Sequence, residues 1–307
     1  MQILLRRLLT AIPTLLLLSF FVFLLLELAP GDAADVLLDQ TASVEAQAAV
    51  RQELGLDRPF LQRYVDYLGG LLQGDMGTSV YSGASVAREI GTRLPYTLLL
   101  VGTAMLLGLA VGVLLGTISA FHKGTIWDAL IRAVISINMA VPVFGTALLL
   151  VGVFALQLRW LPVFGADSLK HLILPAICTA SVLVPGIARL TRASLLDALS
   201  REFVLVAHSK GLPRRAVLLR HIVPFAAIPI VTYGGLQAVR LISSLIVIET
   251  IFNWPGLGGL AVQAAFDRDP MLLQGATLVI AMLAFALLFM VDVIVLALDP
   301  RISSHAV

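Results

Sequence analysis

Six apolar stretches, each long enough to cross a bilayer, dominate this sequence. A transmembrane helix needs about 20 mostly apolar residues, because it rises 1.5 Å per residue through a hydrocarbon core about 30 Å thick. Six windows qualify: 8–29, 95–121, 129–157, 172–196, 225–250 and 272–298. Mean hydropathy is +0.97 and charged residues make up only 13% of the chain, which no water-soluble globular fold could accommodate. We therefore expect an all-α integral membrane protein with six transmembrane helices.

Prolines and tryptophans mark the predicted ends of these spans. Pro95 and Pro175 fall where a first helical turn tolerates a missing N–H, at the start of the second and fourth spans. Asp299-Pro300 stops the sixth span. Trp160 and Trp254 fall at predicted membrane–water interfaces, which amphipathic rings prefer.

Lysine and arginine residues fix the orientation, because they favour cytoplasmic segments. With the N-terminus inside, twelve lie on inner segments and eight on outer ones, which predicts that both termini are cytoplasmic. The net charge of +2 is too small to indicate nucleic acid binding. The expected units are a first span, an outer segment that caps the bundle or receives an external partner, a five-helix core with a cytoplasmic loop, and a tail: 1–30, 31–94, 95–300 with loop 197–224, and 301–307.

A stripe of small residues runs along the second span. Ala104, Gly108, Gly112, Gly116 and Ala120 recur at intervals of four, so they share one helix face. Such a groove lets helix backbones approach closely in lipid. It predicts tight packing, within the chain or against another subunit, although glycine-rich spans are also a common feature of membrane helices.

Few ionisable residues lie within the spans, and each is costly in a bilayer. Glu27, Glu249 and Asp292 fall near predicted ends, where water or an interhelical partner satisfies them. Arg240 lies deeper in the fifth span and is a candidate pathway residue. A structural ion pair and snorkelling to the interface are its alternatives. No chain of acids and histidines crosses the membrane, as a proton-coupled carrier would need.

Signatures of enzymes are missing from the sequence. There is no G-x-x-x-x-G-K-[ST] loop for nucleotide phosphates and no H-E-x-x-H metal motif. The lone cysteine, Cys178, suits a small packing residue in a helix, and it rules out a disulfide framework. We expect neither catalysis nor a bound metal or cofactor in this chain alone.

A basic segment interrupts the apolar pattern between the fourth and fifth spans. Seven of the 21 lysine and arginine residues lie between Arg189 and Arg220. The pattern predicts a short amphipathic helix, a break at Gly211 and a second helical stretch after Pro213, because glycine suits a positive φ and proline cannot continue a helix. The candidate docking residues are Glu202, Phe203, Ala207, His208, Lys210, Gly211, Leu212 and Arg214. A helix that merely lies on the membrane surface is the alternative.

This segment resembles the coupling loop of ATP-binding-cassette (ABC) importer permeases, which has alanines before a glycine and then a proline; here these are Ala207, Gly211 and Pro224. It departs from that signature at Leu205, where glutamate is common, and at Val206. The chain is similar to the dipeptide/oligopeptide/nickel branch, and to the first of its two permease partners, along most of its length. The matching segments are 4–13, 28–32, 54–59, 74–77, 188–192, 210–212, 249–258, 268–269 and 299–302.

The resemblance implies a type I importer permease fold in a bacterial inner membrane. It implies a second permease, two ATPase subunits that bind ATP and Mg²⁺, and an external solute-binding protein. The implied solutes are dipeptides, oligopeptides, glutathione or chelated nickel. The competing hypothesis is a stand-alone secondary transporter or channel, although the two halves of the chain show no convincing repeat.

Overall fold

The computed structural model describes residues 2–28, 44–53 and 55–298, and within them regular structure is helical apart from one isolated bridge between Thr78 and Ser85. The predicted exit of the first span at 29–31, the stop at 299–300 and the tail 301–307 lie outside the described residues. The helices are α1 (Gln2–Leu28), α3 (Val44–Glu53), α4 (Phe60–Leu72), α5 (Val86–Phe121), α6 (Ile126–Ala140), α7 (Val143–Leu150), η1 (Val151–Gln157), α8 (Leu169–Ser200), α9 (Glu202–Ser209), α10 (Arg214–Val217), η2 (Leu218–Ile222), α11 (Val223–Ile251), α12 (Leu257–Phe266) and α13 (Pro270–Leu298).

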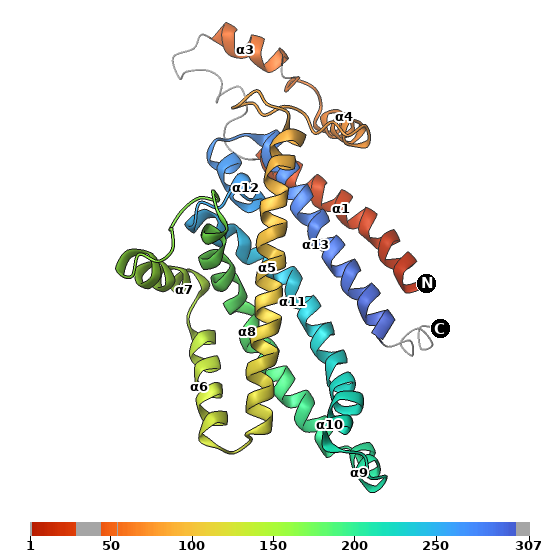
Figure 1. The fold of residues 1–307 in the computed structure, drawn as a ribbon. Helices are drawn as coiled ribbons and strands as arrows, with labels where there is room; N and C mark the ends of the chain where they lie inside the picture. The colour runs from red at the N-terminus through yellow and green to blue at the C-terminus, as the bar shows by residue number, and fades with distance from the viewer. Residues whose placement is uncertain (1, 29–43, 54, 299–307) are drawn as a thin grey trace.

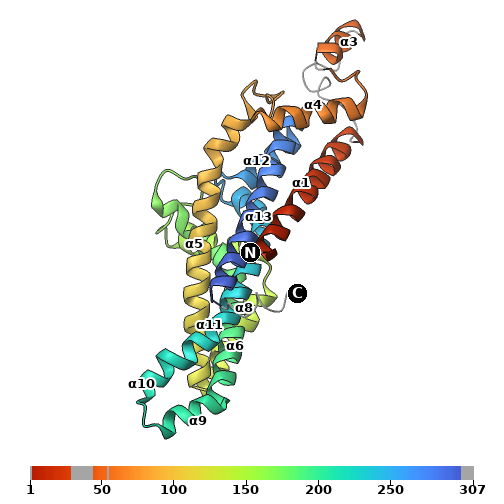
Figure 2. The same ribbon diagram turned by 90° about the vertical axis from the view of Figure 1, so that its right-hand side faces the viewer.

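The long helices run side by side, with α9 at one end of the bundle and α4 at the other (Figure 1). Among the described residues, five helices are long and apolar enough to cross a membrane, and the bent pair formed by α6 and α7–η1 makes six if it counts as one span. The 36 residues of α5 extend about 54 Å at 1.5 Å per residue, well beyond a hydrocarbon core of about 30 Å. Helices α5, α8 and α11 continue past α1 and α13 toward α9 (Figures 1 and 2).

The third apolar window is not one straight helix. It breaks between α6 and α7, where Val141 is extended at φ −89° and ψ 121° and Pro142 follows, and the axes bend by 106°. Proline removes a backbone N–H and pushes the preceding residue out of the helical region, so a continuous helix is not possible here. A hydropathy window registers only apolar length, and it misses this corner.

Two helices begin earlier than the apolar windows suggest. Helix α5 starts at Val86 and α8 at Leu169, so Pro95 and Pro175 lie inside these helices rather than in their first turns. The extra turns of α5 carry charged residues such as Arg88 and Glu89, which depress hydropathy without opposing a helix.

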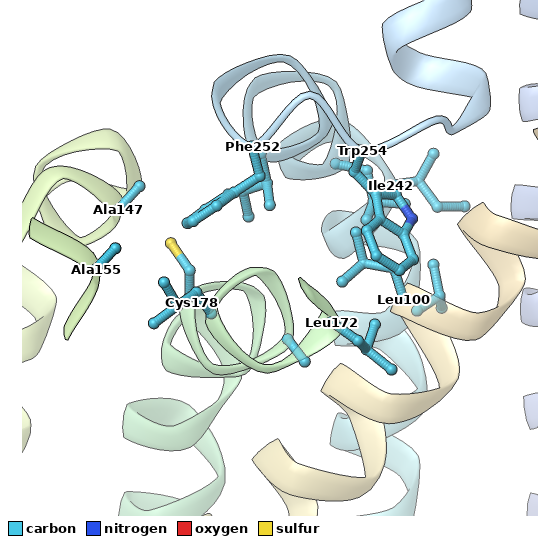
Figure 3. Packing of buried hydrophobic residues seen from close by; sticks show 13 residues of the cluster. Leu100, Ala147, Ala155, Leu172, Cys178, Ile242, Phe252 and Trp254 are labelled. Carbon is cyan, nitrogen blue, oxygen red and sulfur yellow. The ribbon is translucent and has the colours of Figure 1, made fainter. Parts of the chain in front are cut away.

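The largest buried cluster lies between α5, α7, α8 and the end of α11. Cys178 is fully buried and free in α8, among Ala147, Ala155 and Phe252, as expected for a small packing residue (Figure 3). Trp254 contradicts the expectation of an interfacial ring, because it is only 3% exposed. The chain turns back into the bundle after α11, and the indole N–H donates to the Tyr96 carbonyl at 3.0 Å.

The stripe of small residues forms the contact between α5 and α8. A Cβ added at Gly108 would lie 2.8 Å from Leu183, and one at Gly112 would lie 2.8 Å from Ile187. At Gly116 the added atom would lie 2.4 Å from the Ala188 carbonyl oxygen, which is backbone and has little freedom to move. The structure thus places the three glycines at an interface within this chain.

Gly116→Ala should lower the thermal stability of the purified protein, because the methyl group forces two backbones apart. Overpacking of this kind costs about 1–3 kcal/mol. Gly102→Ala in the same helix is the matched control, because its added methyl group meets nothing within 4 Å. Thermal scans in detergent should separate the two variants, and equal midpoints would contradict the proposed contact.

Candidate functional site

The predicted docking segment forms a short helix, α9, that leaves the bundle at a sharp corner. Arg201 separates α8 from α9 and is extended at φ −76° and ψ 147°. Its guanidinium pairs with Asp197 of α8 at 2.9 Å and lies 5.6 Å from the centre of the Phe225 ring in α11. Both members of the ion pair are about half exposed, so the pair adds little stability and serves mainly to orient the corner.

The other end of α9 closes with a glycine, as the sequence predicts. Gly211 adopts φ +77°, and its N–H donates to the His208 carbonyl at 2.9 Å. The Leu212 N–H donates to the Ala207 carbonyl at 3.3 Å. This pair of bonds is a Schellman motif, which satisfies the last carbonyls of the helix. Pro213 then precedes α10 as its N-cap residue.

One face of α9 packs against the bundle. Val204 is 7% exposed and Ala207 is 5% exposed. Phe203 is half-buried, and its ring lies 5.6 Å from that of Phe225. The surrounding cluster consists of Ala120 of α5, Leu195 and Ala198 of α8, Val217 of α10, Ile222 of η2 and Ala226 of α11. A movement of α9 must therefore displace the ends of all these helices.

The opposite face of α9 is apolar and exposed. Leu205 is 72% exposed and Val206 is 51% exposed. These are the two departures from the coupling signature, and the sequence assigned neither of them to docking. Of the candidate docking residues, Phe203 and Ala207 face inward. The others are exposed: Glu202, His208, Lys210, Gly211, Leu212 and Arg214. The outer face thus combines an apolar centre with a charged rim, the usual composition of a protein interface.

A carboxylate near α9 clamps three segments together. Asp128 of α6 is 1% exposed and accepts two bonds of 2.9 Å from the Arg192 guanidinium of α8. Ser119 of α5 donates at 2.6 Å, and the Gly124 N–H donates at 3.1 Å. The sequence predicts a role for Arg192 only as part of the matching segment 188–192, and it predicts none for Asp128. The available signal was that Asp128 is a carboxylate next to the start of a predicted span, on the side of the membrane that carries most of the basic residues.

A second buried carboxylate lies toward the α4 end of the bundle. Glu249 is 1% exposed, so it does not reach water, and its partner is on another helix. Thr97 of α5 donates to it at 2.8 Å, while the N–H groups of Gly258 and Gly259 donate at 2.7 and 3.0 Å. Those groups belong to the first turn of α12, where a carboxylate satisfies free donors. The Leu257 N–H also belongs to this hydrogen-bonded cluster, because it donates to the Thr97 hydroxyl at 2.8 Å.

Arg240 lies on an exposed face of α11 and has no ion-pair partner among the described residues. Leu236 and Val247 are exposed on the same helix. The structural ion pair considered for Arg240 therefore finds no support in the part of the chain that the structure describes.

Comparison with known proteins agrees with this arrangement. Residues 112–304 match the family described as binding-protein-dependent transport system inner membrane component, and residues 1–101 match the N-terminal part of such proteins. The chain belongs to this family. It is a permease of a binding-protein-dependent ABC importer. Membership implies a partner permease, ATPase subunits and a solute-binding protein, and the family is one of transport permeases rather than enzymes.

Curated relatives support this assignment. The permease is 37% identical to the glutathione transport system permease protein GsiC of Escherichia coli (strain K12), over 97% of each chain. It is 38% identical to GsiC of Salmonella typhimurium strain LT2, over 97% of each chain.

Among solved structures, the inward-facing MetNI methionine ABC transporter superposes with a TM-score of 0.59 at 15% identity, covering 68% of this permease and 96% of that chain. An amino acid ABC transporter superposes with a TM-score of 0.53 at 15% identity, covering 70% and 94%. These structures show the fold of the permease.

Thr97→Val should loosen α12. The change keeps the shape of the side chain but leaves the Leu257 N–H without its acceptor in the interior, at a cost of about 1–3 kcal/mol. Hydrogen exchange of residues 255–266 should speed up. Thr103→Val is the matched control, because the Thr103 hydroxyl bonds only to the backbone of its own helix. Equal exchange in the two variants would show that the hydrogen bonds of Thr97 do not hold α12.

Proposed function

We propose that this permease pairs with a second, similar permease to form the translocation pathway for peptides or related small solutes, glutathione among them. Two separate ATPase subunits bind ATP and Mg²⁺ and power transport, and an external solute-binding protein delivers the solute. Helix α9 carries the proposal, because its exposed Leu205 and Val206 face offers a docking surface on a helix fixed to α8 and α11. In this arrangement α9 is cytoplasmic, as are both termini.

The mechanism follows from how α9 is attached. ATP binding closes the ATPase pair and draws the two coupling helices together. Because Val204 and Ala207 are packed against the ends of α5, α8 and α11, this movement passes to the membrane helices and opens the pathway outward. The Asp128–Arg192 clamp joins α6 to the same displacement. Hydrolysis releases the ATPase pair and resets the permease.

The solute class rests on two observations of different kinds. The curated relatives bear the name of a glutathione transport system, and glutathione is a small peptide with free carboxylates. Arg240 supplies an unpaired cation on an exposed face of α11, where it can attract a carboxylate. A peptide-like, carboxylate-bearing solute satisfies both.

Reconstitution separates this function from a stand-alone carrier or channel. Proteoliposomes should take up glutathione or dipeptides only when they contain both permeases and the ATPases, and when the binding protein and ATP are present. Uptake by this polypeptide alone under an ion gradient would overturn the proposal.

Gly211→Val should uncouple ATP hydrolysis from uptake. A β-branched residue is strained at φ +77°, so the exit from α9 would rearrange. Gly83→Val is the matched control, because Gly83 has φ +68° and open space around it but lies in the loop between α4 and α5. The ratio of solute taken up to ATP hydrolysed should fall several-fold in the first variant only. An unchanged ratio in both variants would remove Gly211 from coupling.

Arg240→Gln should weaken transport of anionic and zwitterionic solutes by about fivefold in KM, which corresponds to about 1 kcal/mol. Arg240→Lys keeps the charge and should retain most of the activity. Uptake kinetics in proteoliposomes measure both variants. Unchanged kinetics with glutamine would leave snorkelling as the role of Arg240.

A further inference from the structure

Helix α4, in the segment expected to be a linker or a landing surface, packs one face on α1 through aromatic rings. The rings of Phe60 and Tyr64 lie 5.7 and 5.3 Å from that of Phe20. They also lie 5.3 and 5.5 Å from Phe23, and Tyr67 joins at 6.1 Å. Burial raises the pKa of Tyr67 to about 12. This face of α4 has the character of a core.

Polar contacts fix α4 against the same stretch of α1. The hydroxyls of Tyr64 and Ser19 are 2.8 Å apart, and the Tyr64 hydroxyl lies 3.0 Å from the Leu16 carbonyl oxygen. Arg63 pairs with Glu27 near the end of α1. The contacts extend over several turns of α1, which holds the orientation of α4.

A second apolar group on α4 has no partner in the described chain. Leu61 is 66% exposed, Val65 is 63% exposed and Leu72 is 91% exposed. At about 100° per residue these three side chains fall within an arc of about 40°, directly beside the arc buried on α1. The exposed polar residues share the remaining side: Gln62, Asp66 and Gln73. Helix α4 is therefore amphipathic, and α1 covers only part of its apolar arc.

The position of α4 indicates what covers the part of its apolar arc that α1 leaves exposed. The helix runs crosswise to the long helices, at the end of the bundle opposite α9 (Figures 1 and 2). The contacts of α4 with Phe23 and Glu27 place it beside the last turns of α1, where Leu25 is 66% exposed and Leu28 is 71% exposed. Leu25 and Leu28 belong to the candidate membrane span Leu9–Leu28, so α4 lies beside the last turns of a membrane helix.

We propose that α4 lies in the plane of the bilayer surface beside α1, with Leu61, Val65 and Leu72 inserted at the boundary between headgroups and acyl chains. A crosswise helix with one apolar arc and one polar arc is the form that such interfacial helices take. The exposed apolar arc offers no charged group that a soluble partner could pair with. The charged residue Asp66 lies on the polar side, where it pairs with Arg58 at 3.3 Å. Gln62, Asp66 and Gln73 then face water.

Fluorescence quenching with matched single-cysteine variants tests this placement. Val65→Cys and Leu72→Cys probe the apolar arc, and Gln62→Cys probes the polar arc of the same helix. All three are made in a Cys178→Ala background, labelled with an environment-sensitive fluorophore, and measured with the full chain in nanodiscs of phosphatidylglycerol and phosphatidylethanolamine. These sites are exposed, so labelling should not disturb folding.

Labels at 65 and 72 should be quenched by lipids carrying a spin label near the headgroup, at least threefold more than the label at 62. Aqueous iodide should show the reverse order. Equal iodide quenching at 62 and 65 would overturn the proposal. Shielding of 65 that appears only after a solute-binding protein is added would also overturn it, in favour of a protein occupant. The readout needs no transport, so it stands or falls separately from the proposed function.

Discussion

The close approach of α5 and α8 is the contact on which the rest of this permease depends. Neither helix gains from the hydrophobic effect in lipid, so their association relies on van der Waals contact between backbones that only small residues permit. Helix α8 carries α9 directly, and α5 contributes to both buried carboxylate clusters. Thr97 lies in the first third of α5 and Ser119 in its last turn. The glycine contact thus fixes the two buried carboxylate clusters and α9 relative to one another.

Much of this frame could be predicted from the sequence, because the signals are local. Twenty apolar residues, glycines at intervals of four and a glycine before a proline each have one dominant physical meaning. They predict the spans, the shared helix face and the break at Gly211. The exposed pair Leu205 and Val206 was noticed only as a departure from a signature, since sequence gives no direct measure of which side of a short helix meets the bundle.

The remaining features depend on contacts between distant residues. Helix α12 has only ten residues, so no span-length window detects it. The burial of Glu249 could not be foreseen, because its acceptance of bonds from Gly258 and Gly259 requires the chain to fold back after α11. The burial of Asp128 could not be foreseen either, because its partner Arg192 lies 64 residues away in the sequence. Pro142 is evident in the sequence, but the residues on both sides of it are apolar, so hydropathy alone does not predict the break between α6 and α7.

The two ends of α9 are held by forces of different kinds, and this asymmetry has a consequence. At Gly211 the attachment is made by backbone bonds, which dissolved ions barely affect. At Arg201 it includes an ion pair that is about half exposed, and such a pair weakens as the Debye length shortens. Rising ionic strength should therefore soften the entrance to α9 before its exit. The start of α9 then gains freedom to move, while its end at Gly211 stays fixed by backbone hydrogen bonds.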